Sequence, residues 1–243
     1  MKRRDFVKNT LGAITASYIP FSRALDIPSE IPCMSRTGQI MSLKRGDVAD
    51  LAKSLQRKLL LKSTPHYHQE RMLWNGLADH TLPALIAQCI DSDDVINAVN
   101  FARTHDLLVT VRGGGHGISG KAIANDALLI DLSKMSNLSA NPLTMVATAQ
   151  AGVLLRELDV GTQAHGMAVP AGVVSHTGVA GLTLGGGIGI NMRKMGLTSD
   201  NLLSVQIVTA DGKLRTASDS ENTDLFWAVR GGGGNFGVVT SFT

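Results

Sequence analysis

The residues with the clearest chemical potential form a glycine loop around His116. Residues 107–133 read LLVTVRGGGHGISGKAIANDALLIDLS, with a glycine-rich stretch and one histidine between two apolar runs. Repeated glycines let several backbone N–H groups point at one anion, and Arg112 at the entrance could add positive charge. Such a cradle does not require a histidine, so a solvent-facing or hydrogen-bonded side chain is the simplest interpretation of His116 when this loop is taken alone.

Two familiar phosphate-binding patterns overlie this loop, and neither fits. Residues 115–120 spell G-x-G-x-x-G, but only residues 121–126 separate them from the next apolar run, too short a stretch for the helix that a dinucleotide fold needs. Residues 115–121 also spell G-x-x-x-x-G-K, but Ala122 stands where the magnesium-binding hydroxyl would be. The sequence therefore disfavours a Rossmann half and nucleotide hydrolysis.

Two further segments share this richness in glycine. Residues 170–189 read PAGVVSHTGVAGLTLGGGIG, and residues 230–239 read RGGGGNFGVV. Glycine allows backbone to approach a large flat group closely, so three such segments favour one large cofactor over three unrelated turns. Residues 167–190 carry no Asp, Glu, Lys or Arg and are long enough to span a bilayer, but their proline, histidine and glycines favour buried loops that line a cofactor.

The apolar periodicity predicts an α+β domain. Strands are expected in LPALIAQCI, LLVTV, ALLIDLS, TMVATAQAG and FGVVTSF. Helices are expected in SLQRKLLLK, in DDVINAVNFARTHD with Ser92 as its cap, in LLRELDVGTQAHG ended by Gly166, and in ENTDLFWAVRGGGG. LLSVQIVTADGKLRTAS predicts a hairpin with a two-residue turn at Asp211-Gly212.

The positive charge of the chain is concentrated at its start. The 243 residues carry a formal net charge of +3, but residues 1–24 hold five of the 23 Lys and Arg residues and one of the 20 Asp and Glu residues. The remainder has a net charge of −1, which gives no reason to expect nucleic acid as a partner. A hydrophobic content of 44% is typical of a globular protein.

The opening segment MKRRDFVKNTLGAITASYIPFSRALD resembles a twin-arginine export signal. The match rests on the paired arginines with Phe6, Val7 and Lys8, followed by an uncharged run and a small-x-small cleavage site at residues 22–24. We therefore expect a signal peptide over residues 1–24 and a periplasmic or secreted protein without a membrane span after cleavage. An uncleaved anchor or a basic helix unrelated to export is the alternative.

Histidines and cysteines outside the glycine loop suggest no metal centre. His66 and His68 could bind a metal from a strand, but no Cys, Asp or Glu completes a ligand set, and a solvated loop is the simpler interpretation. Cys33 and Cys89 lack any zinc-type spacing, and Cys89 is expected to be a small buried apolar residue rather than half of a disulfide.

Taken together, the glycine motifs identify a resemblance to a family. R-G-G-G-H-x-x-x-G from Arg112, the glycine series from Pro170, GLTSDNLLSVQIVTADG and DLFWAVRGGGGNFGVVTSF resemble FAD-linked oxidoreductases of the vanillyl-alcohol oxidase and p-cresol methylhydroxylase family, in its berberine-bridge-enzyme-like branch. The resemblance covers about residues 70–243. It implies a PCMH-type FAD-binding domain of two α/β subdomains over residues 77–243, preceded by a lead-in segment over residues 25–76.

The resemblance also implies the cofactor and the residues that hold it. In the family, the glycine loop wraps the FAD pyrophosphate, and the motif histidine, here His116, commonly bonds to the 8α carbon of the flavin, since a neutral imidazole is a nucleophile. Asp131 with the two residues after it matches the strand end that follows the loop. The implied FAD-binding residues are Arg112, Gly113, Gly114, Gly115, His116, Gly117, Ile118, Ser119, Gly120, Leu132, Ser133, Pro170, Gly172, Gly178, Gly181, Gly185, Gly186, Gly187, Gly189, Asn235, Gly237 and Val238.

The sequence departs from the family pattern at several points. Val174 stands where some members attach the flavin through a cysteine, and Leu182 stands where some carry a histidine. His176 lies nearby but matches neither position, so the resemblance gives it no role. Members usually continue into a substrate domain that is missing here, so no catalytic residue is assigned, and we expect the isolated chain to turn over slowly or not at all.

Three functions remain open at this point. The first is oxidation of an alcohol, sugar or similar small molecule by hydride transfer to FAD, which oxygen or another acceptor reoxidises. The second is a flavin-binding fragment without turnover, or one half of a two-chain assembly with a partner that supplies the substrate domain. The third is a reductase that uses NADPH, which fits poorly with a flavin-linking histidine.

Overall fold

The computed structural model describes residues 26–243, so the predicted signal peptide (1–24) lies outside the described residues. In chain order the elements are β1 (Glu30–Met34), β2 (Ile40–Lys44), α2 (Arg45–Ser54), β3 (Leu59–Leu61), α3 (Tyr67–Glu70), η1 (Gly76–Ala78), β4 (Leu85–Gln88), α4 (Ser92–Thr104), β5 (Val109–Arg112), β6 (Leu128–Asp131), β7 (Leu138–Asn141), β8 (Val146–Gln150), α5 (Leu155–Gln163), α6 (Val179–Leu184), α7 (Met192–Met195), η2 (Ser199–Asn201), β9 (Ser204–Val208), β10 (Leu214–Ser218), α8 (Thr223–Val229) and β11 (Val238–Phe242).

The first large sheet has the strand order β3-β4-β6-β5, and β4, β6 and β5 run parallel. Every residue of β4 and β6 is buried, because α4 packs on one face and Tyr67 of α3 packs on the other. The register places Gln88, Asp131 and Arg112 side by side. The carboxyl ends of the three parallel strands therefore meet at one edge of the sheet and present polar side chains there.

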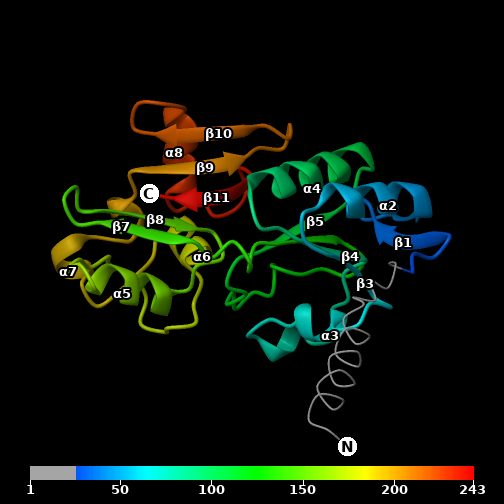
Figure 1. Cartoon of the computed structure of the whole chain (residues 1–243), viewed down its shortest axis with the longest axis horizontal. Helices are drawn as coiled ribbons and strands as arrows, with labels where there is room; N and C mark the ends of the chain where they lie inside the picture. The colour runs from blue at the N-terminus through cyan, green and yellow to red at the C-terminus, as the bar shows by residue number, and fades with distance from the viewer. Residues whose placement is uncertain (1–25) are drawn as a thin grey trace, which may run out of the picture.

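The second large sheet is antiparallel, with the order β10-β9-β11-β8-β7. Figure 1 shows the two sheets side by side, with α4 above the line where they meet. α4 packs on β9 and β11 as well as on β6, and one hydrophobic core runs through both sheets. The Ser92 and Thr240 hydroxyls lie 3.1 Å apart, which adds a polar link between α4 and β11. The α+β domain built from two parts is confirmed.

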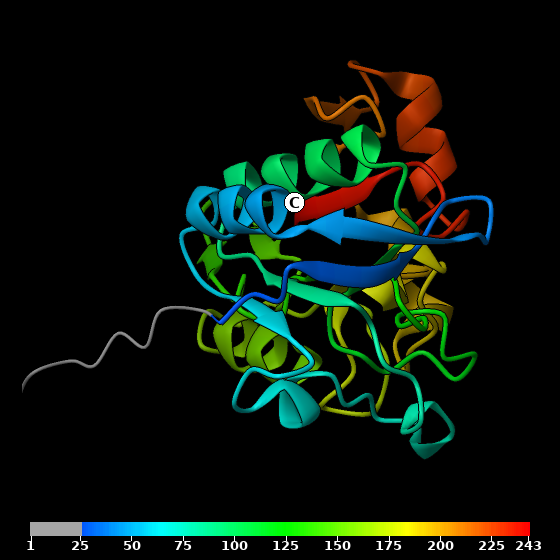
Figure 2. The same ribbon diagram turned by 90° about the vertical axis from the view of Figure 1, so that its right-hand side faces the viewer.

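The segment expected to lead into the domain is built into the first part of it. β1 and β2 form a hairpin, α2 lies beside α4, and β3 pairs with β4 (Figure 2). Buried side chains of residues 26–61, such as Leu43, Val48 and Leu51, belong to the same core as β4 and β6. The core of the first part therefore depends on this segment.

Several local predictions are wrong. The helix expected in SLQRKLLLK is absent, because α2 ends at Ser54 and the three leucines of β3 are all buried in a strand. The cap of α4 is Asp91, whose side chain accepts from the Asp94 N–H. The β9 strand ends at Val208 and the β10 strand begins at Leu214, so their connection is longer than a two-residue turn. β7 is not predicted by the sequence. Its residues are only half-buried or exposed, so no buried apolar run marks this strand.

The other expected elements are present, namely β4, α4, β5, β6, β8, α5, β9, β10, α8 and β11. Residues 167–190 form loops around the short helix α6, and within residues 26–243 no helix is both long and apolar enough to cross a bilayer. Cys33 and Cys89 are free and buried, and burial raises the pKa of both thiols.

Candidate functional site

A buried ion pair anchors the start of the glycine loop. Residues 113–127 join the parallel strands β5 and β6 without a helix between them. Arg112, the last residue of β5, donates from Nε to Asp131 Oδ1 (3.0 Å) and from Nη2 to Asp131 Oδ2 (2.6 Å). The two side chains are 7% and 0% exposed, so this is a bidentate pair held away from water. We expected Arg112 to lend charge to an anion, but its guanidinium is committed to Asp131.

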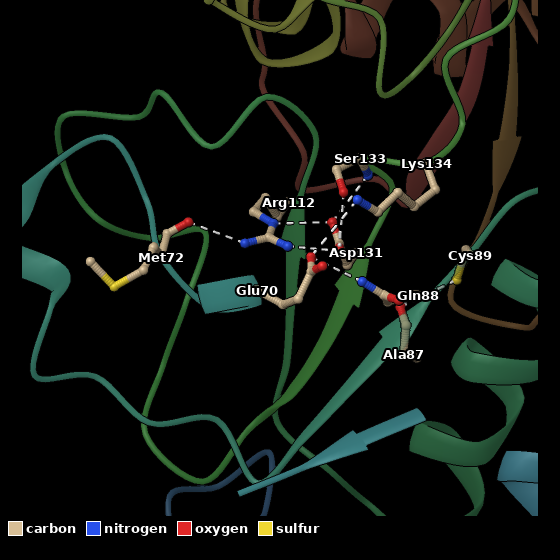
Figure 3. Close-up of polar contacts among 9 residues, drawn as sticks. All are labelled: Glu70, Met72, Ala87, Gln88, Cys89, Arg112, Asp131, Ser133 and Lys134. Atoms are coloured by element: carbon tan, nitrogen blue, oxygen red, sulfur yellow. Dashed lines mark hydrogen bonds and ion pairs between the residues drawn. The ribbon is translucent and has the colours of Figure 1, made fainter. Parts of the chain in front are cut away.

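Further polar groups complete this anchor (Figure 3). Asp131 accepts from the backbone N–H of Ser133 (3.0 Å) and from the Ser133 hydroxyl (3.1 Å), and Arg112 Nη1 donates to the Met72 carbonyl (3.2 Å). A buried ion pair loses its hydration, and this costs free energy unless other groups satisfy its remaining hydrogen bonds. These contacts supply such hydrogen bonds. They also tie β5, β6 and the segment after α3 together at one point.

A polar cleft of about 390 Å³ opens beside this anchor. Its lining residues are Gln69, Glu70, Met72, Trp74, Arg112, Gly113, Gly114, Gly115, Ser133, Ser136, Gly152, Leu154, Arg156 and Glu157. Glu70 Oε2 accepts from Gln88 Nε2 (3.1 Å) and lies 3.9 Å from Lys134 Nζ (Figure 3). Glu157 accepts from the Leu154 backbone N–H (2.8 Å). Residues 112–115, the base of the glycine loop, thus form one wall of a cleft that carries charges of both signs.

Several glycines serve contact between loops rather than contact with a ligand. A Cβ added at Gly114 would lie 2.4 Å from the backbone nitrogen of Gly178, and one added at Gly113 would lie 2.9 Å from the Ala151 carbonyl oxygen. A Cβ at Gly189 would lie 2.0 Å from the Ala171 carbonyl oxygen. The first and second glycine segments therefore touch backbone to backbone, which only glycine permits.

Other glycines in the same loops face open space. Apart from adjacent residues and the backbone of its own helix turn, a Cβ added at Gly117, Gly120 or Gly181 would meet no described atom within 4 Å. Gly120 has a φ of +67°, which by itself favours glycine, whereas the other two have no left-handed φ. Nothing in the described chain accounts for glycine at Gly117 and Gly181, so both leave room for a group that is not part of the chain.

His116 lies between these two kinds of glycine and contacts two aromatic side chains. Its ring stacks on Trp74 at a centroid distance of 4.4 Å and an interplanar angle of 16°. The His176 ring lies 4.8 Å away and is tilted by 39°. Nε2 of His116 is buried and has no hydrogen-bond partner among the described residues. A buried nitrogen of this kind is costly, which suggests a partner that the chain alone does not supply.

The segment before η1 holds the glycine loop in place, which sequence reasoning missed. The Trp74 backbone N–H donates to the Gly115 carbonyl (3.1 Å), and Asn75 Nδ2 donates to the Ile118 carbonyl (2.6 Å). Just before it, Tyr67 donates its hydroxyl to the Pro83 carbonyl (2.5 Å), and burial raises the pKa of Tyr67 to about 12. The only signal in the sequence was the pair Trp74 and Asn75 within an otherwise polar stretch.

His66 and His68, considered as metal ligands in the sequence, join no group of three or more metal-binding side chains among residues 26–243.

The third glycine segment meets the second but lines a different cavity. The backbone N–H groups of Gly231 and Gly233 both donate to the Leu184 carbonyl at the end of α6. Asn235, Gly237 and Val238 line a cavity of about 430 Å³ between α4, β5 and β9.

The remaining predicted residues fall into three groups. Pro170 lines a third cavity of about 150 Å³ and accepts from the Thr198 hydroxyl (2.6 Å). Leu132 is buried in the core, and its N–H donates to the Arg112 carbonyl (2.8 Å). Ile118 and Ser119 are exposed in residues 116–120, the tip of the glycine loop. In the second segment, a Cβ added at Gly172 would lie 3.1 Å from the Leu182 side chain, and one added at Gly187 would lie 2.2 Å from Thr198 Oγ1, with Gly185 and Gly186 between α6 and Gly187. The structure therefore brings the first two segments together at Gly114 and Gly178 and joins the third to the second at the Leu184 carbonyl.

Comparison with known proteins identifies relatives of this arrangement. A family model described as "FAD binding domain" matches residues 83–218, more than half of the chain. The chain is 38% identical to FAD-linked oxidoreductase pgmH of Aspergillus terreus over 204 residues, 83% of this chain and 41% of that protein. It is 35% identical to (R)-6-hydroxynicotine oxidase of Paenarthrobacter nicotinovorans over 187 residues, 77% of this chain and 41% of that protein.

Solved structures show the same similarity in three dimensions. The crystal structure of 6-hydroxy-D-nicotine oxidase from Arthrobacter nicotinovorans matches with a TM-score of 0.76 and 35% identity, covering 78% of this chain and 42% of that one. Phl p 4, a grass pollen allergen with glucose dehydrogenase activity, matches with a TM-score of 0.77 and 32% identity, covering 81% and 42%. The chain thus spans about two fifths of the length of these relatives.

Proposed function

Because the chain belongs to the family of FAD-linked oxidoreductases, whose FAD-binding domain it carries, we propose that it holds FAD at the tip of its glycine loop through a bond to His116. FAD is the cofactor of this family. When bound, it accepts a hydride from a small-molecule substrate. The residues of this chain bind the cofactor, orient it and shield it from water.

The free space in the two touching loops fits such a group. Gly117, in the first loop, and Gly181, in the second, each leave open space, and a side chain at either position would occupy it. Backbone N–H groups of the loop are the natural partners of a pyrophosphate, since Arg112 is already neutralised by Asp131. The polar cleft beside the loop base offers further hydrogen-bonding groups.

One observation carries the proposed bond to His116. Nε2 of His116 is buried and has no hydrogen-bond partner in the part of the chain that the structure describes, and the ring packs against Trp74. Protein precipitated with acid should keep its yellow colour, and His116→Ala should release the flavin into the supernatant. His165→Ala, which changes an exposed histidine after α5, is the matched control. Complete release of flavin from the wild-type protein would rule out the bond, although FAD binding would stand.

The substrate class is proposed from the relatives. One of them is named for oxidation of 6-hydroxynicotine and another has glucose dehydrogenase activity. We propose that this protein oxidises an alcohol, a sugar or a similar small molecule, with oxygen or another acceptor taking the electrons. Bleaching of the visible flavin absorbance on adding members of a panel of alcohols and sugars, without oxygen, tests this. No bleaching by any member would favour the second candidate below.

A second candidate function is a flavin-binding part that works only with a further domain or a partner chain. Large apolar side chains are exposed at Trp74, which stacks on His116, and in or next to the first two glycine segments, namely Trp74 (57%), Ile118 (79%), Val173 (72%), Ile188 (69%) and Ile190 (84%). Exposed apolar groups gathered at a cofactor site are typical of a surface that another domain covers. Purified protein that contains flavin, resists reduction by the whole panel and forms concentration-dependent oligomers would support this candidate.

We also propose that the protein is exported through the twin-arginine route, on the strength of Arg3 and Arg4 with Phe6 and Lys8. Arg3→Lys combined with Arg4→Lys should retain the protein in the cytoplasm, as measured by cell fractionation. Arg36→Lys, outside the leader, is the control. Unchanged delivery of the double variant would contradict this assignment.

A further inference from the structure

Trp74, His116 and His176 come together from three separate loops. Trp74 lies between α3 and η1, His116 lies in the loop after β5, and His176 lies in the loop before α6. The His116 ring stacks on Trp74 and lies 4.8 Å from the His176 ring. Trp74 and His176 do not form an aromatic pair with each other among the described residues. His116 is therefore the shared member of both contacts.

Backbone contacts on both sides of His116 fix the loop against the Trp74 segment. Gly115, before His116, accepts from the Trp74 N–H at 3.1 Å, and Ile118, after it, accepts from Asn75 Nδ2 at 2.6 Å. The loop cannot slide past Trp74 without breaking one of these hydrogen bonds. The stack is thus built into the fold and is not a chance encounter of two exposed rings.

Stacking, rather than hydrogen bonding, sets the orientation of the imidazole. A functional histidine is commonly oriented by a hydrogen bond to one of its ring nitrogens. In His116, Nε2 is buried and has no such partner among the described residues. Glycines on both sides, Gly115 and Gly117, leave the local backbone with little means of restricting the side chain. The rings of Trp74 and His176 are what remain to hold it.

We propose that Trp74 and His176 are positioning residues that hold the His116 ring in the orientation in which it bonds to the cofactor. This inference rests on the proposed bond between His116 and the 8α carbon of FAD. That bond replaces one N–H and one C–H bond. The two hydrogens, with two electrons, pass to the isoalloxazine ring, which dioxygen then reoxidises with formation of hydrogen peroxide. An imidazole that samples many orientations would form the bond rarely, because such reactions depend on a held geometry.

The test compares ring-deleting with ring-preserving variants. Trp74→Ala and His176→Ala should each lower the acid-stable fraction of bound flavin about tenfold, because the held geometry is lost. Total flavin before precipitation should change little. Trp74→Phe and His176→Phe retain a ring for stacking and should stay within about twofold of wild type. Trp227→Ala, an exposed tryptophan on α8, and His165→Ala are the matched controls.

A second readout needs no flavin. In a Trp227→Phe background and without cofactor, Trp74 is the only tryptophan of the chain, so its fluorescence reports on the stack. Both His116→Ala and His176→Ala should change that emission, and thermal midpoints should match the background protein.

The outcomes separate this inference from the one beneath it. An acid-labile flavin in the wild-type protein would overturn both. An acid-stable wild type with unchanged alanine variants would overturn the positioning role alone. Loss of total and acid-stable flavin in equal proportion would also overturn that role, since the two residues would then act on binding rather than on orientation.

Discussion

The base and the tip of the glycine loop differ sharply, although their sequences look alike. At the base, Arg112 is locked to Asp131 in the core, and Gly114 touches Gly178 backbone to backbone. At the tip, a Cβ added at Gly117 would meet no described atom within 4 Å, and the His116 ring lies against two aromatic rings while its buried Nε2 has no hydrogen-bond partner within residues 26–243. The described chain accounts for the polar and packing contacts of the base, whereas at the tip it leaves open space and one buried nitrogen without a hydrogen bond.

This difference separates glycines that packing requires from glycines that packing does not explain. A glycine whose Cβ would strike backbone is explained by folding alone, as at Gly114 and Gly189. A glycine that faces open space with an ordinary φ is not required by packing, and at Gly117 and Gly181, within the glycine-rich loops, it leaves room for the proposed cofactor. Substitutions at the base should therefore affect stability, and substitutions at the tip should affect the cofactor.

The largest effect is expected at the ion pair of the base. Asp131→Ala leaves the Arg112 side chain, 7% exposed, without its counter-charge, so the free energy of unfolding should fall by about 3–5 kcal/mol. Urea unfolding measures this. Replacement of both partners, Arg112→Met with Asp131→Leu, should recover much of the loss, since no buried charge remains. A loss below about 1 kcal/mol in Asp131→Ala would mean that the pair behaves like an exposed one.

A smaller loss is expected where the two loops touch. Gly114→Ala places a Cβ 2.4 Å from the Gly178 nitrogen, and forcing the loops apart should cost about 3 kcal/mol of unfolding free energy. Gly117→Ala is the matched control from the tip and should stay within about 0.5 kcal/mol of wild type. Equal stability losses in the two variants would erase the distinction between base and tip.

The smallest stability effect is expected beside the base, at Tyr67. Tyr67→Phe removes the hydrogen bond to the Pro83 carbonyl and should cost about 1 kcal/mol at neutral pH. Burial raises the pKa of Tyr67 to about 12, against about 10 for an exposed tyrosine. The neutral form is favoured in the folded protein, so this stabilisation is present below pH about 10 and is lost as the pH rises from there to about 12. Unfolding curves of wild type and Tyr67→Phe should converge over that window, and a constant difference would contradict the assignment.

The sequence predicted what depends on local pattern. The apolar runs of β4, β5 and β6 and the periodicity of α4 are local signals, and the elements follow them. The sequence does not identify Asp91 as the cap of α4, because Asp91 and Ser92 are neighbours and either side chain could cap the helix. In the structure, the Ser92 hydroxyl donates to Thr240, which is distant in sequence.

What the sequence could not show depends on distant pairs. The five glycines of residues 113–120 look equivalent until residues 151 and 178 are placed against Gly113 and Gly114. Trp74 and His176 meet His116 only because three loops converge. The burial of Arg112 follows from the register of β5 on β6, which no local pattern specifies.

The most direct test of the central claim is an FAD titration of variants at the open glycines. In a His116→Ala background, where FAD binds reversibly, Gly117→Leu and Gly181→Leu should each weaken FAD binding at least about tenfold, or about 1.4 kcal/mol. Their thermal midpoints should stay close to the background, because the Cβ of a new side chain at either position would meet no described atom within 4 Å apart from adjacent residues and its own helix backbone. FAD affinities equal to that of the background protein would contradict the claim that the open tip of the glycine loop holds the cofactor.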